Sequence, residues 1–349
     1  MRRVLRGAIT ILLFFSNAAY AQNPRSLDVL TASRTGTYYR LVQDIGRLLT
    51  DKCGFTVNPI ETNGSLYNLT HLKDRGIKLA LVQSDVLHYV LARNDIYDMA
   101  NWAKFYRYVL PLYPEDVHLV TKKRLNIKSL QDLARKNVAI GEQDSGTFVT
   151  STLILKESQI QVKPLTINPD KALKRLLSDN LSNEDRVDAF FLVAGKPVPL
   201  LKESNDEFKN LTLVPITVKD KLADVYSSTK ISTEDYLWLD FEVDTVSTVA
   251  VLMSYDYRDE RCADIATIKK SVKDGLEELK AGRDYHDTWK TIDFSLTIPG
   301  WRQNECVENY ADLPFSCSAT KRCEFDTFCK DKHPRPVRNI CIVASPRCR

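Results

Sequence analysis

The chain has 349 residues, of which 44% are hydrophobic and 27% are charged, a composition typical of globular proteins and unlike that of disordered chains. With 49 Lys and Arg against 45 Asp and Glu, the formal net charge is +4, which argues against a strongly basic nucleic-acid-binding protein. Twelve Gly and 14 Pro exclude collagen-like and linker-dominated chains.

Residues 1–21 have the features of a secretory signal peptide. Three arginines are followed by an apolar run at 8–15 and by a small-x-small cleavage site at Ala19-Tyr20-Ala21. The apolar run is too short to span a bilayer, so an uncleaved anchor is the less favoured alternative. We therefore predict export to the periplasm, where disulfides persist, and a net charge of +1 after cleavage.

Strand and helix patterns alternate along the rest of the chain. Hydrophobic runs predict strands at 27–30, 55–60, 78–82, 137–140, 187–193 and 245–253. Helical spacing predicts helices at 38–49, from Gly64-Ser65 onward, from 145 to about 157, and from about 259 to 281. This alternation indicates an α/β protein with mostly parallel sheets.

Two adjacent extended runs at 109–112 and 117–120 predict a crossover between two lobes, and we expect a return crossing within 226–245. The predicted organisation is a signal peptide at 1–21, a discontinuous lobe 1 at 26–113 with 246–304, a lobe 2 at 114–245, and a Cys-rich, disulfide-stapled tail at 305–349.

Several short segments between 27 and 199 follow one another in a specific order. They are Gly36-Thr37-Tyr38-Tyr39, Thr62-Asn63-Gly64-Ser65 with Asn68, ALVQSD at 80–85, LYPEDVH at 112–118, Gly141 with Ser145-Gly146-Thr147, and VDAFFLVAGKP at 187–197. Together they resemble the TAXI family of extracytoplasmic solute receptors, which serve TRAP transporters. A looser match continues to about residue 298.

This resemblance implies a periplasmic-binding-protein fold, with two α/β lobes around a ligand cleft, to which this chain adds a C-terminal Cys-rich extension. It implies capture of a small organic anion, of the amino-acid or dicarboxylate/keto-acid type, and delivery to a TRAP-type membrane permease. It also implies that the protein is not an enzyme. The chain departs from the family at the first turn, 31–36, which is poorer in glycine, and at Arg40, where the family tends to have proline.

Ligands of open α/β sheets bind beyond the carboxyl ends of strands, where helix N-termini point. Free backbone N–H groups at a helix N-terminus suit a carboxylate, and glycine lets the ligand approach the backbone. Three predicted helix starts have this chemistry, although each one is also typical of an ordinary helix cap. The candidate ligand-binding residues are Arg34, Gly36, Thr37, Tyr38, Thr62, Gly64, Ser65, Asn68, Gln83, Asp85, Ser145, Gly146, Thr147, Phe191 and Gly195.

Some of these side chains have two interpretations. Arg34 is the cation nearest the first turn and suits bidentate binding of a carboxylate, or else it is a solvated surface residue. Asp85 either faces the ligand or caps the next helix. Lys196 either binds a distal acid group or is solvated. At the predicted crossover, we expect Glu115 and His118 to position the hinge rather than to touch the ligand.

The cysteines are concentrated near the C-terminus, where few aliphatic residues accompany them. We expect Cys53 to pair with Cys262 in the main body and the other six to staple the tail, with zinc ligation as the alternative. The disulfide candidates are Cys53, Cys262, Cys306, Cys317, Cys323, Cys329, Cys341 and Cys348. The tail from Lys321 onward carries a net charge of +5, which suits an acidic partner or a membrane surface, or else marks a solvated appendage.

The five histidines show no paired metal-ligand spacing, and neither a Gly-x-Ser-x-Gly elbow nor a P-loop occurs. We therefore predict no metal, no cofactor, no nucleic-acid partner and a monomeric binding protein. The alternative function is a ligand-binding receptor or sensor whose Cys-rich tail contacts a signalling or envelope partner. A secreted enzyme on the same scaffold is the third hypothesis, because fold does not fix function.

Overall fold

A computed structural model describes residues 26–53, 56–74, 77–92, 99–202, 206–257, 261–308, 323–329 and 341–348. The predicted signal peptide and Cys317 lie outside these residues, and so does the side chain of Cys53. Within the described ranges, we find no helix with the length and apolar character that a membrane span requires.

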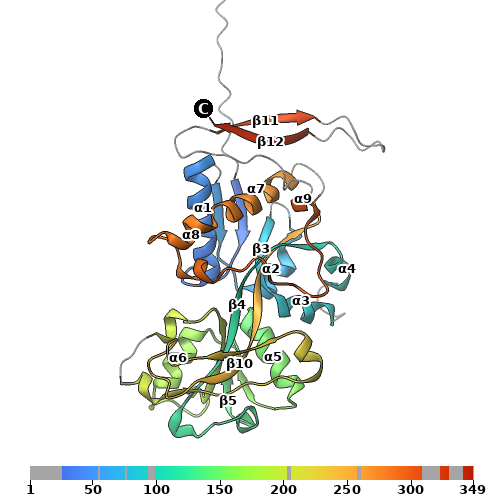
Figure 1. The fold of residues 1–349 in the computed structure, drawn as a ribbon. Coiled ribbons are helices and arrows are strands. Elements are labelled where there is room, and N and C mark those ends of the chain that lie inside the picture. The colour runs from blue at the N-terminus through green and yellow to red at the C-terminus, as the bar shows by residue number, and fades with distance from the viewer. Residues whose placement is uncertain are drawn as a thin grey trace, which may run out of the picture.

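The main body contains ten strands and nine α-helices in its described part (Figure 1). The strands are β1 (Ser26–Leu30), β2 (Thr56–Ile60), β3 (Ile77–Gln83), β4 (Tyr106–Lys122), β5 (Asn137–Ala139), β6 (Lys163–Leu165), β7 (Ala189–Ala194), β8 (Leu211–Leu213), β9 (Ser227–Ile231) and β10 (Val243–Tyr255). The helices are α1 (Thr37–Cys53), α2 (Ser65–His71), α3 (Ser84–Leu91), α4 (Met99–Ala103), α5 (Gly146–Glu157), α6 (Pro169–Leu177), α7 (Arg261–Asp274), α8 (Leu276–Ala281) and α9 (Glu305–Glu308). A separate pair of strands follows, β11 (Cys323–Cys329) and β12 (Cys341–Cys348).

The ten strands form one sheet in the order β2-β1-β3-β10-β4-β7-β5-β6, with β8 beside β4 and β9 beside β10. Figure 1 shows two lobes joined by the long strands β4 and β10. We call the part with β1–β3, α1–α4 and α7–α9 the first lobe, and the part with β5–β9, α5 and α6 the second lobe. The predicted boundaries at 113/114 and 245/246 fall inside β4 and β10, and their exact positions stay a prediction.

The sheet is mixed rather than mostly parallel. Strands β2, β1 and β3 are parallel to one another, as are β6, β5 and β7. Between these two sets, β4 and β10 are antiparallel to each other and to β3, β7, β8 and β9. The prediction of mostly parallel pairing is therefore wrong at the centre of the sheet. The reason is that the chain enters the second lobe along β4 and returns beside it along β10.

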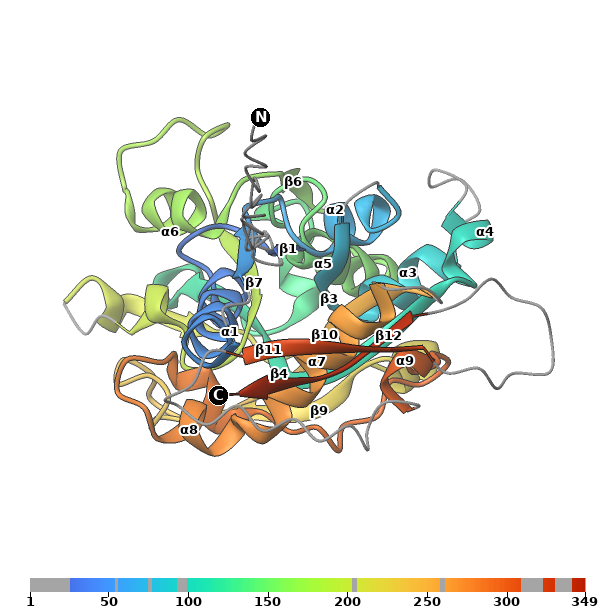
Figure 2. The same cartoon turned by 90° about the horizontal axis from the view of Figure 1, so that it is seen from above.

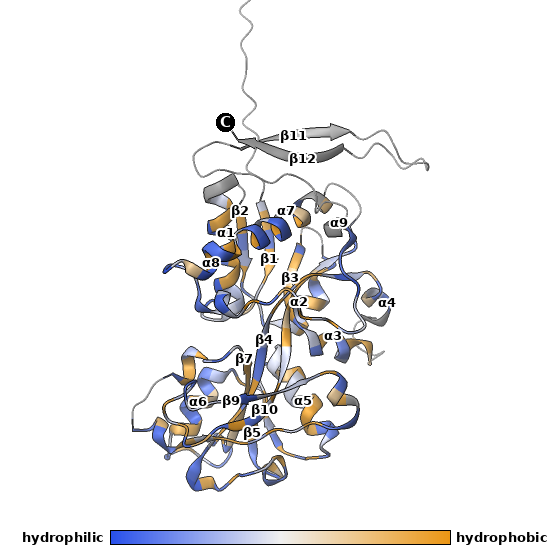
Figure 3. Ribbon diagram, in the orientation of Figure 1, coloured by the Kyte–Doolittle hydropathy of each residue, from blue (hydrophilic) through white to orange (hydrophobic). Residues whose placement is uncertain are grey.

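Each lobe buries apolar clusters on both faces of its part of the sheet, as α/β proteins do. In the first lobe, α1 and α7 cover one face, and α2 and α3 cover the other (Figure 2). In the second lobe, α6 and α5 take the equivalent places. Figure 3 shows strong hydrophobic colour along β3, between the two helical layers. Val149 of α5 is completely buried within a first-lobe cluster, so the lobes are in direct contact.

Two predicted elements differ in detail from the observed ones. The extended runs at 109–112 and 117–120 belong to one continuous strand, β4. The helix predicted from about 259 to 281 is broken at Gly275, between α7 and α8. A Cβ atom at Gly275 would lie 2.6 Å from Leu48 Cδ2 and 2.9 Å from the carbonyl oxygen of Ser271, so a larger residue at the break would have to displace its neighbours.

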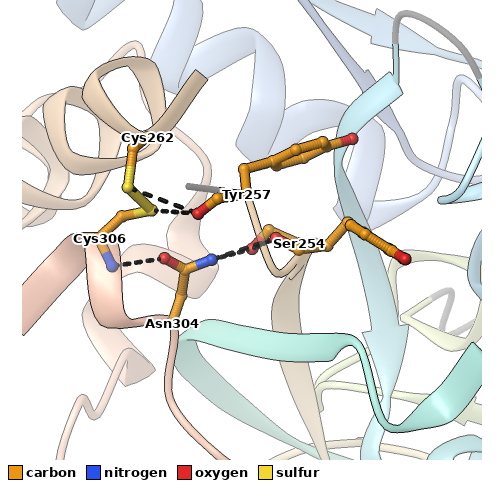
Figure 4. Close-up of a disulfide and its surroundings, with 6 residues drawn as sticks. Ser254, Tyr257, Cys262, Asn304 and Cys306 are labelled. Carbon is orange, nitrogen blue, oxygen red and sulfur yellow. Dashed lines mark hydrogen bonds between the residues drawn. A yellow bond between two sulfur atoms is a disulfide. The ribbon is translucent and has the colours of Figure 1, made fainter. Parts of the chain in front are cut away.

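The predicted pairing of Cys53 with Cys262 is wrong. Cys262 of α7 forms a disulfide with Cys306 of α9, and the carbonyl oxygen of Tyr257 lies beside both sulfur atoms (Figure 4). Asn304 fixes the approach of this segment, because its side-chain amide donates to Ser254 Oγ and its Oδ1 accepts from the backbone N–H of Cys306. Cys306 is therefore bonded to the first lobe instead of stapling the tail.

The pairing of the tail cysteines stays a prediction. In the backbone register of β11 and β12, Cys323 lies opposite Cys348, and Cys329 lies opposite Cys341. Directly opposed residues of an antiparallel pair have Cα atoms about 4.5–5.5 Å apart, which suits disulfide bonds.

Candidate functional site

Two of the three predicted helix starts meet between the lobes. The backbone N–H groups of Leu66 and Tyr67, in the first turn of α2, both donate to the carbonyl oxygen of Asp144, at 3.1 Å each. Gly64 precedes α2 with φ 112°, a conformation that glycine adopts without strain. A Cβ atom there would be in ordinary van der Waals contact with Ser145 Cα, at 3.5 Å, so the backbone conformation rather than crowding favours glycine.

The side chain of Gln83 lies against the start of α5. Gln83 ends β3 and is 3% exposed, and its backbone N–H donates to Ser65 Oγ at 3.1 Å. A Cβ atom on Gly146 would lie 1.2 Å from Gln83 Oε1 and 3.0 Å from Ser65 Oγ, so any larger residue would displace this amide. Within the described part of the chain, Gln83 Nε2 has no hydrogen-bond partner.

Asp85 connects the first lobe to the second. It is completely buried, and its Oδ2 accepts hydrogen bonds from Thr150 Oγ1 at 2.5 Å and from the Tyr226 hydroxyl at 2.8 Å. Its own N–H donates to Thr248 Oγ1 on β10 at 3.2 Å. Burial raises the pKa of Asp85, while the hydrogen bonds from Thr150 and Tyr226 oppose that rise. The other carboxylate oxygen, Oδ1, has no partner among the residues that the structure describes.

The remaining predicted helix start, at Gly36-Thr37-Tyr38, contributes Tyr38, whose side chain reaches β4. The Tyr38 hydroxyl donates to Glu115 Oε2 at 2.6 Å, and the Tyr113 hydroxyl donates to Glu115 Oε1 at 3.4 Å. Glu115 is 4% exposed, and burial raises its pKa to about 8. The side chain is therefore mostly protonated at neutral pH, at the point where β4 passes between the lobes.

The next residues of β4 make contacts within the second lobe. Burial raises the pKa of Asp116 to about 6 and lowers that of His118 to about 4. His118 lies between the carbonyl oxygen of Asp116 and the hydroxyl of Tyr236, at 2.9 and 2.8 Å. The Nζ atom of Lys196 lies 4.0 Å from Asp235 and also donates to a backbone carbonyl, so its charge already has protein partners. The hinge role expected for Glu115 and His118 stays a prediction.

Several predicted ligand residues have structural partners near the first helix start. Arg34 pairs with Glu61 at 2.9 Å and has 71% of its side chain exposed. Gly36 closes a turn by donating its N–H to the carbonyl oxygen of Ser33, and Thr37 begins α1.

The polar residues of α2 also hold the fold together. The buried Asn68 amide donates to the carbonyl oxygens of Thr31 and Leu81. Thr62 Oγ1 is hydrogen-bonded to Asn68 Oδ1 at 2.6 Å and accepts from the N–H of Gly64 at 3.1 Å.

In the second lobe, most of the predicted ligand residues likewise serve the fold. Ser145 caps α5 by accepting from the backbone N–H of Phe148, and Thr147 Oγ1 accepts from that of Val193. Phe191 is 1% exposed within the apolar core of this lobe. Gly195 packs against the ring of Tyr113, which would lie 3.1 Å from a Cβ atom there.

Sequence reasoning missed three residues of the buried cluster. Thr150 lies one helical turn after Gly146, so it could have been found from that spacing. Tyr226 and Thr248 come from segments far along the chain, and no local pattern marks them. Among the described residues, no group of His, Cys, Asp or Glu side chains is arranged to hold a metal ion.

A sequence profile described as the NMT1-like family matches residues 29–292. Similar solved structures include the ligand-binding core of GluR0 from Nostoc punctiforme in complex with L-glutamate, with 15% identity, a TM-score of 0.45, and coverage of 76% of this chain and 96% of that one. They also include the alkanesulfonate-binding protein SsuA from Xanthomonas axonopodis pv. citri bound to MOPS, with 15% identity, a TM-score of 0.41, and coverage of 75% and 78%.

These identities and TM-scores are too low for the ligands of those proteins to be transferred to this chain. The profile, in contrast, covers more than half of the chain. The protein therefore belongs to the NMT1-like family, and its architecture is a two-lobed α/β fold of the periplasmic-binding-protein type.

Proposed function

We propose that the protein is an extracytoplasmic solute-binding protein that captures a small organic anion between its lobes. The observation that supports this most is the buried polar cluster in which Gln83 and Asp85 of the first lobe meet Gly146, Thr150 and Tyr226 of the second. Two polar atoms of this cluster lack a partner in the described structure. Because an unsatisfied buried polar group costs about 1–3 kcal/mol, a solute that supplies the missing partners gains affinity.

The arrangement explains how binding would be coupled to closure. Among the described residues, β4 and β10 alone carry sheet pairing from one lobe to the other, and Asp85 of the cluster bonds to Thr248 on β10. A solute that touches both lobes does so only in the closed form, so it shifts the population toward that form. For such a receptor we expect a dissociation constant near micromolar, which corresponds to a binding free energy of about −8 kcal/mol.

The proposed cellular location and membrane partner rest on the order of the sequence segments that resemble the TAXI family. On that basis we propose export by the N-terminal signal peptide, a periplasmic location, a monomeric state and delivery to a TRAP-type permease. No step requires a cofactor. Co-location of the gene with genes for a TRAP permease would support this partner.

Solute binding is tested by thermal shift and calorimetry of the mature protein with a panel of amino acids, dicarboxylates and keto acids. We expect at least one solute to raise the melting temperature. The variant Gly146→Ala should weaken its binding at least tenfold, because the new Cβ atom overlaps Gln83 Oε1. Thr152→Ala, on the same helix but outside the polar cluster, is the control and should bind normally. If no solute stabilises the folded protein, the proposed function is wrong.

The rival role of the tail, contact with a signalling or envelope partner, is tested by truncation. The cut belongs after Glu308, because removing Cys306 would also break its disulfide with Cys262. If permease-dependent uptake survives this truncation, the tail is not part of delivery. If uptake is lost while solute binding persists, the tail is needed for contact with a membrane partner.

A further inference from the structure

The interface between the lobes is rich in carboxyl groups and poor in cations. Asp85 and Glu115 lie at this interface, and each is at most 4% exposed. The hydrogen bonds that reach the carboxyl groups of Asp85 and Glu115 come from hydroxyl groups and, at Asp85, also from the backbone of Val86. In the described part of the chain, no ion pair joins either of them to a lysine or arginine. The two candidate cations from the sequence, Arg34 and Lys196, pair with Glu61 and Asp235.

The two central carboxyl groups differ in how fully they are bonded. Both oxygens of Glu115 accept from tyrosine hydroxyls, and its pKa of about 8 keeps the group mostly protonated at neutral pH. At Asp85, the hydrogen bonds from the Thr150 and Tyr226 hydroxyls both go to Oδ2, and Oδ1 has no partner within the described residues. Asp85 also lies in the first turn of α3, an eight-residue helix whose N-terminal dipole favours a negative charge. Asp85 is therefore the better placed of the two to hold a negative charge.

Oδ1 of Asp85 and Nε2 of Gln83 are the two buried side-chain atoms at this interface that lack a protein partner within the described residues. One is an acceptor and the other a donor, and they belong to residues only two positions apart, where β3 ends and α3 begins. A buried carboxylate oxygen without a hydrogen-bond partner is unfavourable, whereas one that faces an ammonium group forms a charge-assisted hydrogen bond. These two atoms therefore suit a solute that has a positively charged donor for Asp85 Oδ1 and an acceptor for Gln83 Nε2.

We infer that the solute carries a protonated amine, that Asp85 Oδ1 accepts a hydrogen bond from this amine, and that Gln83 Nε2 donates to an acceptor atom of the same molecule. This inference rests on the proposed function, because it concerns the same site. It narrows the solute class to amino acids, which keep a carboxylate, and it excludes keto acids and dicarboxylates without an amine as preferred ligands. The competing view is that Asp85 only holds the lobes together through Thr150 and Tyr226.

The experiment compares solutes that differ only at the amine. Calorimetry measures the dissociation constants of L-glutamate against 2-oxoglutarate, and of L-alanine against pyruvate. In at least one pair, the amine should bind at least tenfold more tightly than the keto acid, because a hydrogen bond to a charged partner contributes that much. In Asp85→Asn, which keeps the side-chain shape, we expect the preference to fall below threefold.

Two further variants separate recognition from folding and from lobe contact. Asp188→Asn changes another buried carboxylate, 3% exposed, which directly precedes β7 and accepts from the backbone N–H of Asn137. This variant should leave the preference for the amine over the keto acid unchanged. Thr150→Val removes one hydroxyl donor to Asp85. It should weaken the binding of the amine and of its matched keto acid by a similar factor.

The outcomes distinguish this inference from the proposed function. If keto acids or dicarboxylates bind as tightly as the matched amines, the inference is overturned while solute capture stands. If Asp85→Asn keeps the full preference, the assignment to Asp85 is overturned. If neither the four probes nor the wider panel binds to the folded protein, both the inference and the proposed function fail.

Discussion

Two buried aspartates of the first lobe are bonded in different ways. Asp44 of α1 is 2% exposed, and both of its oxygens have partners: Oδ2 accepts from the backbone N–H of His286 and from Trp289 Nε1, at 2.8 Å each, and Oδ1 pairs with Arg47. Asp85 is equally buried, but only one of its oxygens is bonded within the described structure. Fully partnered buried groups hold a fold together, whereas a half-partnered group at a junction between lobes suggests a task beyond folding.

The largest expected effect concerns stability at Asp44. Asp44→Ala leaves the indole N–H of Trp289, the backbone N–H of His286 and the Arg47 guanidinium without their acceptor. We expect the free energy of unfolding to fall by about 3–5 kcal/mol, measured by urea denaturation. Asp274→Ala, which removes an exposed partner of Lys270, should change it by less than about 0.5 kcal/mol. A loss below 1 kcal/mol at Asp44 would contradict the contrast.

A pH-dependent effect of intermediate size is expected at Glu115. Its pKa is about 8 in the folded protein against an ordinary value of 4.5, so the folded state binds more protons than the unfolded state between these values. Glu115 therefore lowers stability as the pH rises from about 5 to 8. Glu115→Gln should remove this pH dependence. Between pH 5 and pH 8, the free energy of unfolding should fall by at least about 1.4 kcal/mol more in the wild type than in the variant. Equal slopes in both proteins would show that Glu115 is ionised when folded.

The smallest effect is expected for the stability of Asp85→Asn without solute. The asparagine oxygen still accepts from Thr150 and Tyr226, and the substitution removes a buried charge. We expect the free energy of unfolding at pH 7 to stay within about 1 kcal/mol of the wild type by urea denaturation. A loss as large as that of Asp44→Ala would mean that both aspartates are structural, and the contrast between them would disappear.

Much of the fold follows from local patterns in the sequence. The runs at 27–30, 78–82 and 187–193 become β1, β3 and β7, because buried strands of α/β proteins are continuous apolar segments. The direction of the central strands was not predictable from such runs, because it depends on the path of the chain between the lobes.

The candidate site was predictable where a glycine marks a helix start. Gly64 and Gly146 were found this way, and the structure brings their helices together. Tyr226 and the pairing of Cys262 with Cys306 were not predictable, because both depend on tertiary contacts between distant segments. The ligand roles predicted for Asn68 and Phe191 stay a prediction. In the structure, the Asn68 amide donates to backbone carbonyls, and Phe191 packs in the apolar core of the second lobe.

The Cys262–Cys306 bond also decides which lobe carries whatever follows it in the chain. It fastens the start of the C-terminal extension to α7, so the extension is tethered to the lobe that holds β1–β3. A partner that binds this extension would therefore be attached to the first lobe and would stay with that lobe if the second lobe moved, as proposed, on solute binding.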